Sequence, residues 1–479
     1  MTRLRLVLAL CALLPALAQA AGIGEDGARL LLTRTGFGAN PAKIAELAPL
    51  SRAQAVDRVL ANPRTEPLTP PPGWVMQPIE LPRYAQLPED QKKALRQQEN
   101  QRSLELKGWW LGEMRATDSP ISEKMTLFWH NHFVSGLDKV NSPELMARQN
   151  LLLRREALGN FGTLLHEIAH DPAMMRYLDT ANNRKGQPNE NFAREVMELF
   201  TLGEGHYSEQ DIREAARAFT GWGMQPGSGD FVNRPRLHDD GIKTVFGQSG
   251  NYDGDQVLGL LLQRPDTARF VTTKLWRYLV SPTPDPRSVD RLAAGFYDSG
   301  YQIKPLVRAL LMTDAFWKSG GQLVKSPVEL TVGTLVTFDL TPADYRPLAL
   351  FNRNLGQDLF SPPNVKGWPG GDDWINSATL LARKQFLARL SGGGINLPSG
   401  GPAMLPVATG LDDPSQKATE RRLTRLNLDT ADWAERYHVD SVHRASHLLL
   451  PVKPASPPQA GDAGEVVREL LLDAAYQVD

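Results

Sequence analysis

The only cysteine of this 479-residue chain, Cys11, lies inside an apolar N-terminal stretch, and its position limits how the rest of the chain can be stabilised. Two arginines precede the apolar run 6–17, and residues 18–20 read Ala-Gln-Ala, the small-residue pattern of a cleavage site. We therefore predict a secretory signal peptide over residues 1–20, with cleavage after Ala20 and a periplasmic or secreted mature protein. That mature chain has no cysteine for a disulfide, so burial of an apolar core must supply its stability.

The composition is compatible with such a core. Hydrophobic residues make up 41% of the chain and charged residues 22%, the ordinary balance of a globular protein. The run 6–17 is too short to cross a bilayer and no second run follows, so we expect no transmembrane segment after signal cleavage. The formal net charge of −1 leaves no basic surplus, and we therefore expect no nucleic-acid partner.

Apolar residues recur at helical spacing along most of the chain, and capping residues separate the helical stretches. This pattern predicts a mainly α fold, with one large, irregular multi-helix domain over residues 22–390. A short β-hairpin insertion is expected within 228–247, where alternating residues flank an Asp-Gly pair. A glycine-rich linker over 391–402 and a C-terminal tail over 403–479 with a terminal helix complete the predicted organisation.

One predicted helix, ISEKMTLFWHNHFVS, contains two histidines. At helical periodicity His132 shares the apolar face with Met125 and Phe128, whereas His130 points away. A buried histidine needs a hydrogen-bond partner. His132 is therefore either a core histidine bonded to a backbone carbonyl or a functional group, as a metal ligand or an acid/base.

Ionisable residues and carboxamides are densest between residues 166 and 222. A helix over 190–202 is predicted there, and its cap and polar face comprise Asn189, Glu190, Asn191, Arg194, Glu195 and Glu198. The helix after it presents Arg213 and Arg217. This stretch is the predicted location of a functional site.

The same stretch contains the motif H-E-x-x-H, formed by His166, Glu167 and His170. In zinc peptidases this spacing places two imidazoles on one helix face, and Glu190 stands where a third ligand would be expected. Against this reading, Pro172 interrupts the helix just after the second histidine, and both histidines lie opposite the apolar stripe. The alternative is two solvated histidines and an ordinary ladder of charged side chains.

Several stretches together resemble a large bacterial family known as domain of unknown function 1800. The matching pieces are RLLLTRTGFG, FWHNHFVS, DPAMMRYLD, NNRKGQPNENFAREVMELFTLG, EAARAFTGW, HDDGIKTVFG, RPDTARFVTTKLWRYLV and PPNVKGWPGG. They span roughly residues 26–390. The resemblance implies an exported, largely helical protein with no established activity. Such proteins are often encoded beside a second exported family that is similar to the sulfatase and alkaline-phosphatase superfamily.

The family pattern is carried by a set of polar residues and one tryptophan. They are His130, Asn131, His132, Asn189, Glu190, Asn191, Arg194, Glu195, Glu198, Arg213, Arg217, Trp222, His238, Asp239 and Lys243. His166 and Glu167 do not belong to that pattern. The resemblance therefore weakens the zinc-peptidase reading and favours the other polar residues.

Two hypotheses for function follow. The first is a metal-dependent hydrolase in which a divalent metal is held by ligands among His130, His132, Glu190, Glu198, His238 and Asp239. Glu195 would then be the general base, and Arg194, Arg213 and Lys243 would hold an anionic substrate. It requires histidines of the first helix and acids of the second to meet in one sheltered pocket.

The second hypothesis is a non-catalytic exported scaffold, with the neighbouring sulfatase- or phosphatase-like protein as its partner. The same residues, with Asn131, Asn189, Asn191 and Arg217, would then form a structural polar network. A bidentate pairing of Arg194 with a carboxylate would favour this reading.

Overall fold

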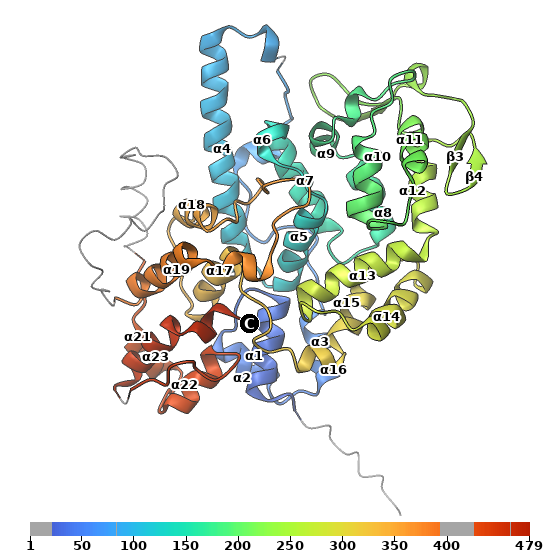
Figure 1. Ribbon diagram of the computed structural model, residues 1–479. Helices are drawn as coiled ribbons and strands as arrows, with labels where there is room; N and C mark the ends of the chain where they lie inside the picture. The colour runs from blue at the N-terminus through green and yellow to red at the C-terminus, as the bar shows by residue number, and fades with distance from the viewer. Residues whose placement is uncertain (1–21, 83, 393–425, 460) are drawn as a thin grey trace, which may run out of the picture.

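The computed structural model describes residues 22–82, 84–392, 426–459 and 461–479. The predicted signal peptide, most of the predicted linker and the first part of the predicted tail lie outside these residues. The described chain is mainly helical with two small β-hairpins, which confirms the predicted fold class (Figure 1). None of its helices combines the length and apolar character that a membrane crossing needs.

The first part of the chain, up to residue 177, consists mainly of helices. They are α1 (Gly24–Thr35), α2 (Pro41–Leu47), α3 (Arg52–Val59), α4 (Glu89–Ala116), α5 (Pro120–His132), α6 (Leu137–Val140), α7 (Pro143–Arg155), α8 (Phe161–Ala169) and α9 (Pro172–Tyr177). Proline at the first helical position and a polar cap before it start several of them. Asp171, for example, accepts a hydrogen bond from the Met174 amide at 3.0 Å and so caps α9.

The middle of the chain begins with α10 (Asn191–Glu195), which continues directly into the π-helical turn η4 (Val196–Thr201). The helices that follow are α11 (Glu209–Ala218), α12 (Gly254–Leu262), α13 (Pro265–Leu279), α14 (Pro286–Asp298), α15 (Ile303–Leu311) and α16 (Asp314–Trp317). The last helices are α17 (Pro327–Thr337), α18 (Arg346–Asn354), α19 (Ser377–Leu390), α21 (Thr430–Arg436), α22 (Val442–Leu449) and α23 (Ala463–Leu472). Short 3₁₀ turns are η1 (Gly73–Met76), η2 (Tyr84–Gln86), η3 (Thr180–Asn182), η5 (Pro235–Leu237), η6 (Gly371–Trp374) and η7 (Ala474–Gln477).

The β insertion consists of two hairpins rather than one. Strand β1 (Trp222–Met224) pairs with β2 (Phe231–Asn233), and β3 (Lys243–Val245) pairs with β4 (Gln248–Gly250). The expected turn at the Asp-Gly pair was wrong, because Asp239 accepts a hydrogen bond from the Gly241 amide at 2.9 Å and binds Arg217. These contacts hold that segment as a connection between the two hairpins.

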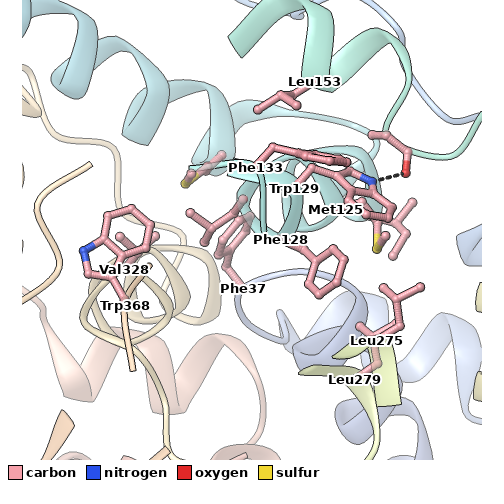
Figure 2. Packing of buried hydrophobic residues seen from close by; sticks show 14 of the residues in the cluster. Phe37, Met125, Phe128, Trp129, Phe133, Leu153, Leu275, Leu279, Val328 and Trp368 are labelled. Atoms are coloured by element: carbon pink, nitrogen blue, oxygen red, sulfur yellow. Dashed lines mark hydrogen bonds between the residues drawn. The ribbon is translucent and has the colours of Figure 1, made fainter. Parts of the chain in front are cut away.

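The core is organised around α5, which packs on α1, α4 and α7. Figure 2 shows its aromatic side chains at the centre of the apolar cluster, where the Trp129 indole donates to the Ala157 carbonyl at 2.9 Å. His132 is 3% exposed, as predicted for the apolar face, but His130 is 1% exposed. The expectation that His130 points away from the core was wrong, because other segments cover α5 on every side.

The described part of the tail packs on the main body. Helix α22 contacts α1, and α23 contacts α19. An isolated antiparallel bridge pairs Val324 with Val478, and the amide of Gly321 donates to the Asp479 carbonyl at 2.9 Å. Residues 426–459 and 461–479 therefore complete the helical core.

Candidate functional site

A cavity of about 480 Å³ lies beside α5 and is lined by segments far apart in sequence. The contributing segments are the end of α1, one face of α5, α13, the start of α17, the loop 366–374 and Asp479. Four of the stretches that carry the family resemblance, those containing Arg34, Asn131, Lys274 and Trp368, meet there. We take this cavity, called the α5 cavity below, as the candidate functional site.

The three consecutive residues His130, Asn131 and His132 tie α5 to three different places. The Phe360 amide donates to His130 Nε2 at 3.1 Å. Asn131 Oδ1 accepts the Trp368 amide at 2.7 Å, and a Cβ on Gly367 would lie only 2.3 Å from that oxygen. Only glycine fits there, also because its φ is +85°. The first two residues thus clamp the loop 360–370, whereas His132 lines the cavity together with Asn131.

His132 contacts the C-terminal end of η4. Its Nε2 lies 3.0 Å from the Phe200 carbonyl oxygen, so Nε2 carries the proton and Nδ1 is left as an acceptor. The Lys274 ammonium, on α13, donates to that Nδ1 at 3.3 Å and to the Leu199 carbonyl at 3.0 Å. The last carbonyls of a helix have no partner within the helix, and this end attracts cations. His132 therefore meets the second helix at a backbone carbonyl, and the expected meeting with Glu190 and Glu198 in one pocket was wrong, because these acids bind Arg194 and Tyr207 instead.

The cations of the α5 cavity fall into two groups. Lys124 forms a buried ion pair with Glu329, Arg34 lies 3.4 Å from an Asp479 carboxylate oxygen, and Lys366 lies 3.8 Å from Glu204.

Lys274 and Arg277, one turn apart on α13, have no carboxylate partner among the described residues. Lys274 is partly buried and Arg277 is exposed. Within the described structure the wall of the cavity thus carries two cations that form no ion pair, although the carboxylate of Asp372 also lines it.

Burial controls protonation in this region. It lowers the pKa of His130 to about 3, and burial together with the charge of Lys274 lowers the pKa of His132 well below its usual value. Both imidazoles are neutral at physiological pH. Burial, reinforced by Arg277, lowers the pKa of Lys274 to about 8.

The predicted polar helix face lies outside the α5 cavity. Arg194 forms two 2.8 Å hydrogen bonds with Glu209 and reaches Glu190 at 3.3 Å. Glu198 accepts a 2.6 Å hydrogen bond from Tyr207, and burial together with Glu198 raises the pKa of Glu195. The bidentate Arg194 pair is the arrangement expected of a structural network.

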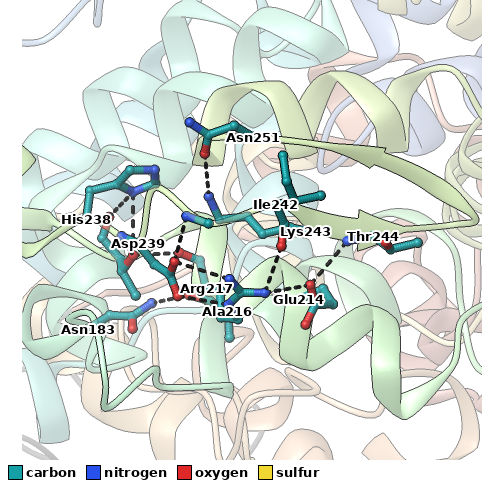
Figure 3. A network of polar contacts seen from close by, with 12 residues as sticks. Asn183, Glu214, Ala216, Arg217, His238, Asp239, Ile242, Lys243, Thr244 and Asn251 are labelled. Atoms are coloured by element: carbon teal, nitrogen blue, oxygen red, sulfur yellow. Dashed lines mark hydrogen bonds and ion pairs between the residues drawn. The ribbon is translucent and has the colours of Figure 1, made fainter.

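Further predicted residues gather around Arg217 (Figure 3). Its guanidinium binds Asp239 at 2.8 and 3.2 Å and Glu214 at 2.8 Å. Hydrogen bonding from Arg217 lowers the pKa of Asp239 to about 2. His238 Nδ1 lies 2.9 Å from the Thr220 carbonyl, and buried Lys243 donates to Asn251 at 3.1 Å. Arg217 is thus matched by two carboxylates, whereas Lys243 donates to a neutral amide oxygen.

The remaining predicted polar residues make local contacts. The Asn191 amide donates to Asn189 Oδ1 at 2.9 Å, and Arg213 donates to Gln210 at 2.8 Å. Neither pair lines the α5 cavity. These contacts stabilise a helix start and a helix surface.

The H-E-x-x-H histidines face an acid that the motif did not indicate. His166 Nδ1 and His170 Nε2 lie 2.9 and 3.2 Å from the same oxygen of Asp255, while Glu167 pairs with Arg155. Burial raises the pKa of Asp255, but its interactions with the two histidines outweigh burial and the pKa lies below its usual value. Glu190 pairs with Arg194 instead of joining this cluster.

The structure distributes the expected metal ligands over several places. His130 and His132 lie in the core beside the α5 cavity, Glu190 and Glu198 lie on α10–η4, and His238 and Asp239 lie in the Arg217 network. Within the described ranges, no three His, Cys, Asp or Glu side chains gather with the geometry of a metal site.

The residues that sequence reasoning missed are Lys274 and Arg277. A signal was present, because neither has an acidic residue three or four positions away on its helix. Their proximity to His132 and to the end of η4 depends on tertiary packing, which the local sequence does not encode.

The fold and cavity define a mainly helical protein with a partly basic internal cavity. A comparison with protein-family models matches residues 30–472 to the family described as Protein of unknown function (DUF1800). The chain belongs to this family, as its sequence motifs predicted. Comparisons with curated proteins and with solved structures found no match.

Proposed function

We propose that the α5 cavity binds a small anionic ligand, and that Lys274 and Arg277 are the cations that receive it. The observation that carries the proposal is the absence of a carboxylate partner for either residue within the described structure. Every other cation of the cavity wall, namely Arg34, Lys124 and Lys366, faces a carboxylate.

Because Lys274 is partly buried, its lack of a carboxylate partner carries a desolvation cost. A partly buried ammonium that meets only neutral acceptors is disfavoured relative to one in water, and this cost appears as the lowered pKa of Lys274. An anion in the cavity would offset the cost and gain charge-assisted hydrogen bonds. Arg277 adds a planar donor group one helical turn away, which suits a carboxylate or a phosphate.

The cavity has the size and chemistry of a small-molecule site. Its volume of about 480 Å³ lies within the usual range for ligand pockets. Phe128, Tyr278, Trp368 and Trp374 supply apolar surface beside the charged groups. This combination suits a ligand with an anionic group and a less polar body.

We further propose that the ligand is encountered outside the cytoplasm. The basic, apolar and small-residue order of residues 1–20 supports export. N-terminal sequencing of protein recovered from the producing cell tests this, with Ala21 as the expected first residue. An intact Met1 on protein retained in the cytoplasm would contradict it.

Isothermal titration calorimetry with inorganic phosphate and with citrate tests the binding proposal. We expect Arg277→Ala and Lys274→Met to weaken the tighter of the two by about tenfold or more, since each removes a charge-assisted contact worth roughly 1.5–3 kcal/mol. Arg291→Ala, at an exposed position of helix α14, is the matched control and should bind like the wild type. Equal affinities in all four proteins, or no binding of either anion, would contradict the proposal.

A further inference from the structure

We infer that Lys274 is an amine nucleophile that forms an imine with an anionic carbonyl compound, such as a 2-oxo acid, held in the α5 cavity. This inference rests on the proposed anion site and names its ligand class. It assigns to Lys274 a chemical role beyond that of a counter-ion.

The hydrogen-bond acceptors around Lys274 match a neutral amine. An amine has two N–H groups and one lone pair, whereas an ammonium has three N–H groups and no lone pair. The described structure places two acceptors at Nζ, the Leu199 carbonyl at 3.0 Å and His132 Nδ1 at 3.3 Å. Both acceptors are uncharged, because burial keeps His132 in the neutral state. The two N–H groups of the amine can use these two acceptors, and Lys274 itself lines the cavity.

The electrostatic surroundings of Lys274 also favour the neutral amine. Burial and the positive charge of Arg277 lower the pKa of Lys274 to about 8. Roughly one Lys274 in ten is then unprotonated at pH 7, far more than for a solvated lysine. Desolvation and a neighbouring cation are the two means by which proteins activate lysine as a nucleophile.

The chemical step is balanced without any other reactant. The Nζ lone pair attacks the carbonyl carbon, a C–N bond forms, and the C=O π electrons move to oxygen. The oxygen takes up two protons, both supplied by the amine, and leaves as water while the C=N bond forms. Arg277 holds the carboxylate of the oxo acid one helical turn from the reacting nitrogen.

Lys124 provides an internal comparison in the same cavity. It is 1% exposed and is bound to the carboxylate of Glu329, which stabilises the charged ammonium. An ammonium has no lone pair and cannot attack a carbonyl. The inference therefore requires Lys274 to react and Lys124 to remain unmodified.

Reductive trapping tests the inference on the full chain. The protein is incubated at pH 8 with pyruvate and sodium cyanoborohydride, digested, and mapped by mass spectrometry. We expect the reduced adduct at Lys274, formed at least about tenfold faster than at Lys124 or at exposed Lys318. Acetone, which has the carbonyl but no carboxylate, should label Lys274 more slowly, and the labelling rate with pyruvate should rise with pH to a plateau above about pH 8.

Phosphate calorimetry on the same samples separates the two proposals. The variant Lys274→Arg keeps the positive charge, so it should still bind the anion but form no adduct at that position. Anion binding in the wild type without preferential labelling of Lys274 would overturn the amine inference and leave the anion site standing. Neither anion binding nor labelling would overturn both, and equal labelling of all lysines would overturn the inference alone.

Discussion

Two regions of this protein are rich in charged side chains, and they differ in how those charges are balanced. Around α10 and α11 the arginines are matched by acids, with Arg194 on Glu209 and Arg217 on Asp239 and Glu214. Along the α5 cavity, Lys274 and Arg277 lack such partners in the described structure. The density of ionisable residues therefore does not locate a binding site. A charge that the protein itself leaves unbalanced is the better indicator.

The largest effect should come from breaking the buried ion pair of the cavity wall. Glu329→Gln leaves the Lys124 ammonium buried without a counter-charge, so we expect the free energy of unfolding to fall by roughly 3–5 kcal/mol. Urea denaturation followed by circular dichroism measures this. A loss below about 1 kcal/mol would show that the pairing is not what distinguishes Lys124 from Lys274.

Lys274→Met should separate stability from binding. It removes a cation that has no counter-ion and keeps an apolar stem, so we expect the free energy of unfolding to change by less than about 1 kcal/mol. Phosphate affinity should nevertheless fall by about tenfold or more, because the principal cation is lost. A strongly destabilised variant that retains wild-type affinity would reverse the roles assigned to the two lysines.

The pH dependence of stability gives a second test of whether Lys274 lacks a counter-ion in the folded protein. The pKa of Lys274 is about 8 in the folded protein and lies below that of an unfolded lysine, so the unfolded state binds more protons between these two values. Stability from this group therefore rises with pH from about 8 to about 10 and is constant below that window. Buried Lys325, with a pKa lowered to about 8, acts in the same sense and remains in the variant.

The test therefore compares the pH dependence of the free energy of unfolding in the wild type and in Lys274→Met. We expect the free energy of unfolding of the wild type to rise more steeply between pH 8 and 10 than that of Lys274→Met. Superimposable slopes would show that Lys274 titrates like a solvated lysine.

The smallest effect should come from breaking the surface ion pair between Arg194 and Glu209. Glu209 is exposed, and solvent screens its interaction with Arg194. We expect Glu209→Gln to leave both the urea midpoint and the phosphate affinity at their wild-type values. A clear loss of phosphate binding would move the functional site to α10 and α11.

Local sequence patterns were sufficient for most of the fold but for only part of the site. Helix α5 and the burial of His132 followed from helical periodicity, and the bond of His132 to a backbone carbonyl is one of the two alternatives that the sequence left open. The burial of His130 did not, because the loop 360–370 that covers it comes from a distant part of the chain. The Asp-Gly pair suggested a hairpin turn, yet the tertiary contact of Asp239 with Arg217 decides its conformation. Lys274 was missed for the same reason, since its significance comes from what α13 meets in space.

Anomalous diffraction from crystals soaked in selenate tests the central claim most directly, because selenium locates a bound tetrahedral anion without ambiguity. We predict a selenium peak in the α5 cavity, within about 4 Å of Lys274 Nζ and the Arg277 guanidinium. Peaks confined to the arginines of α10 and α11, with an empty α5 cavity at saturating selenate, would contradict it.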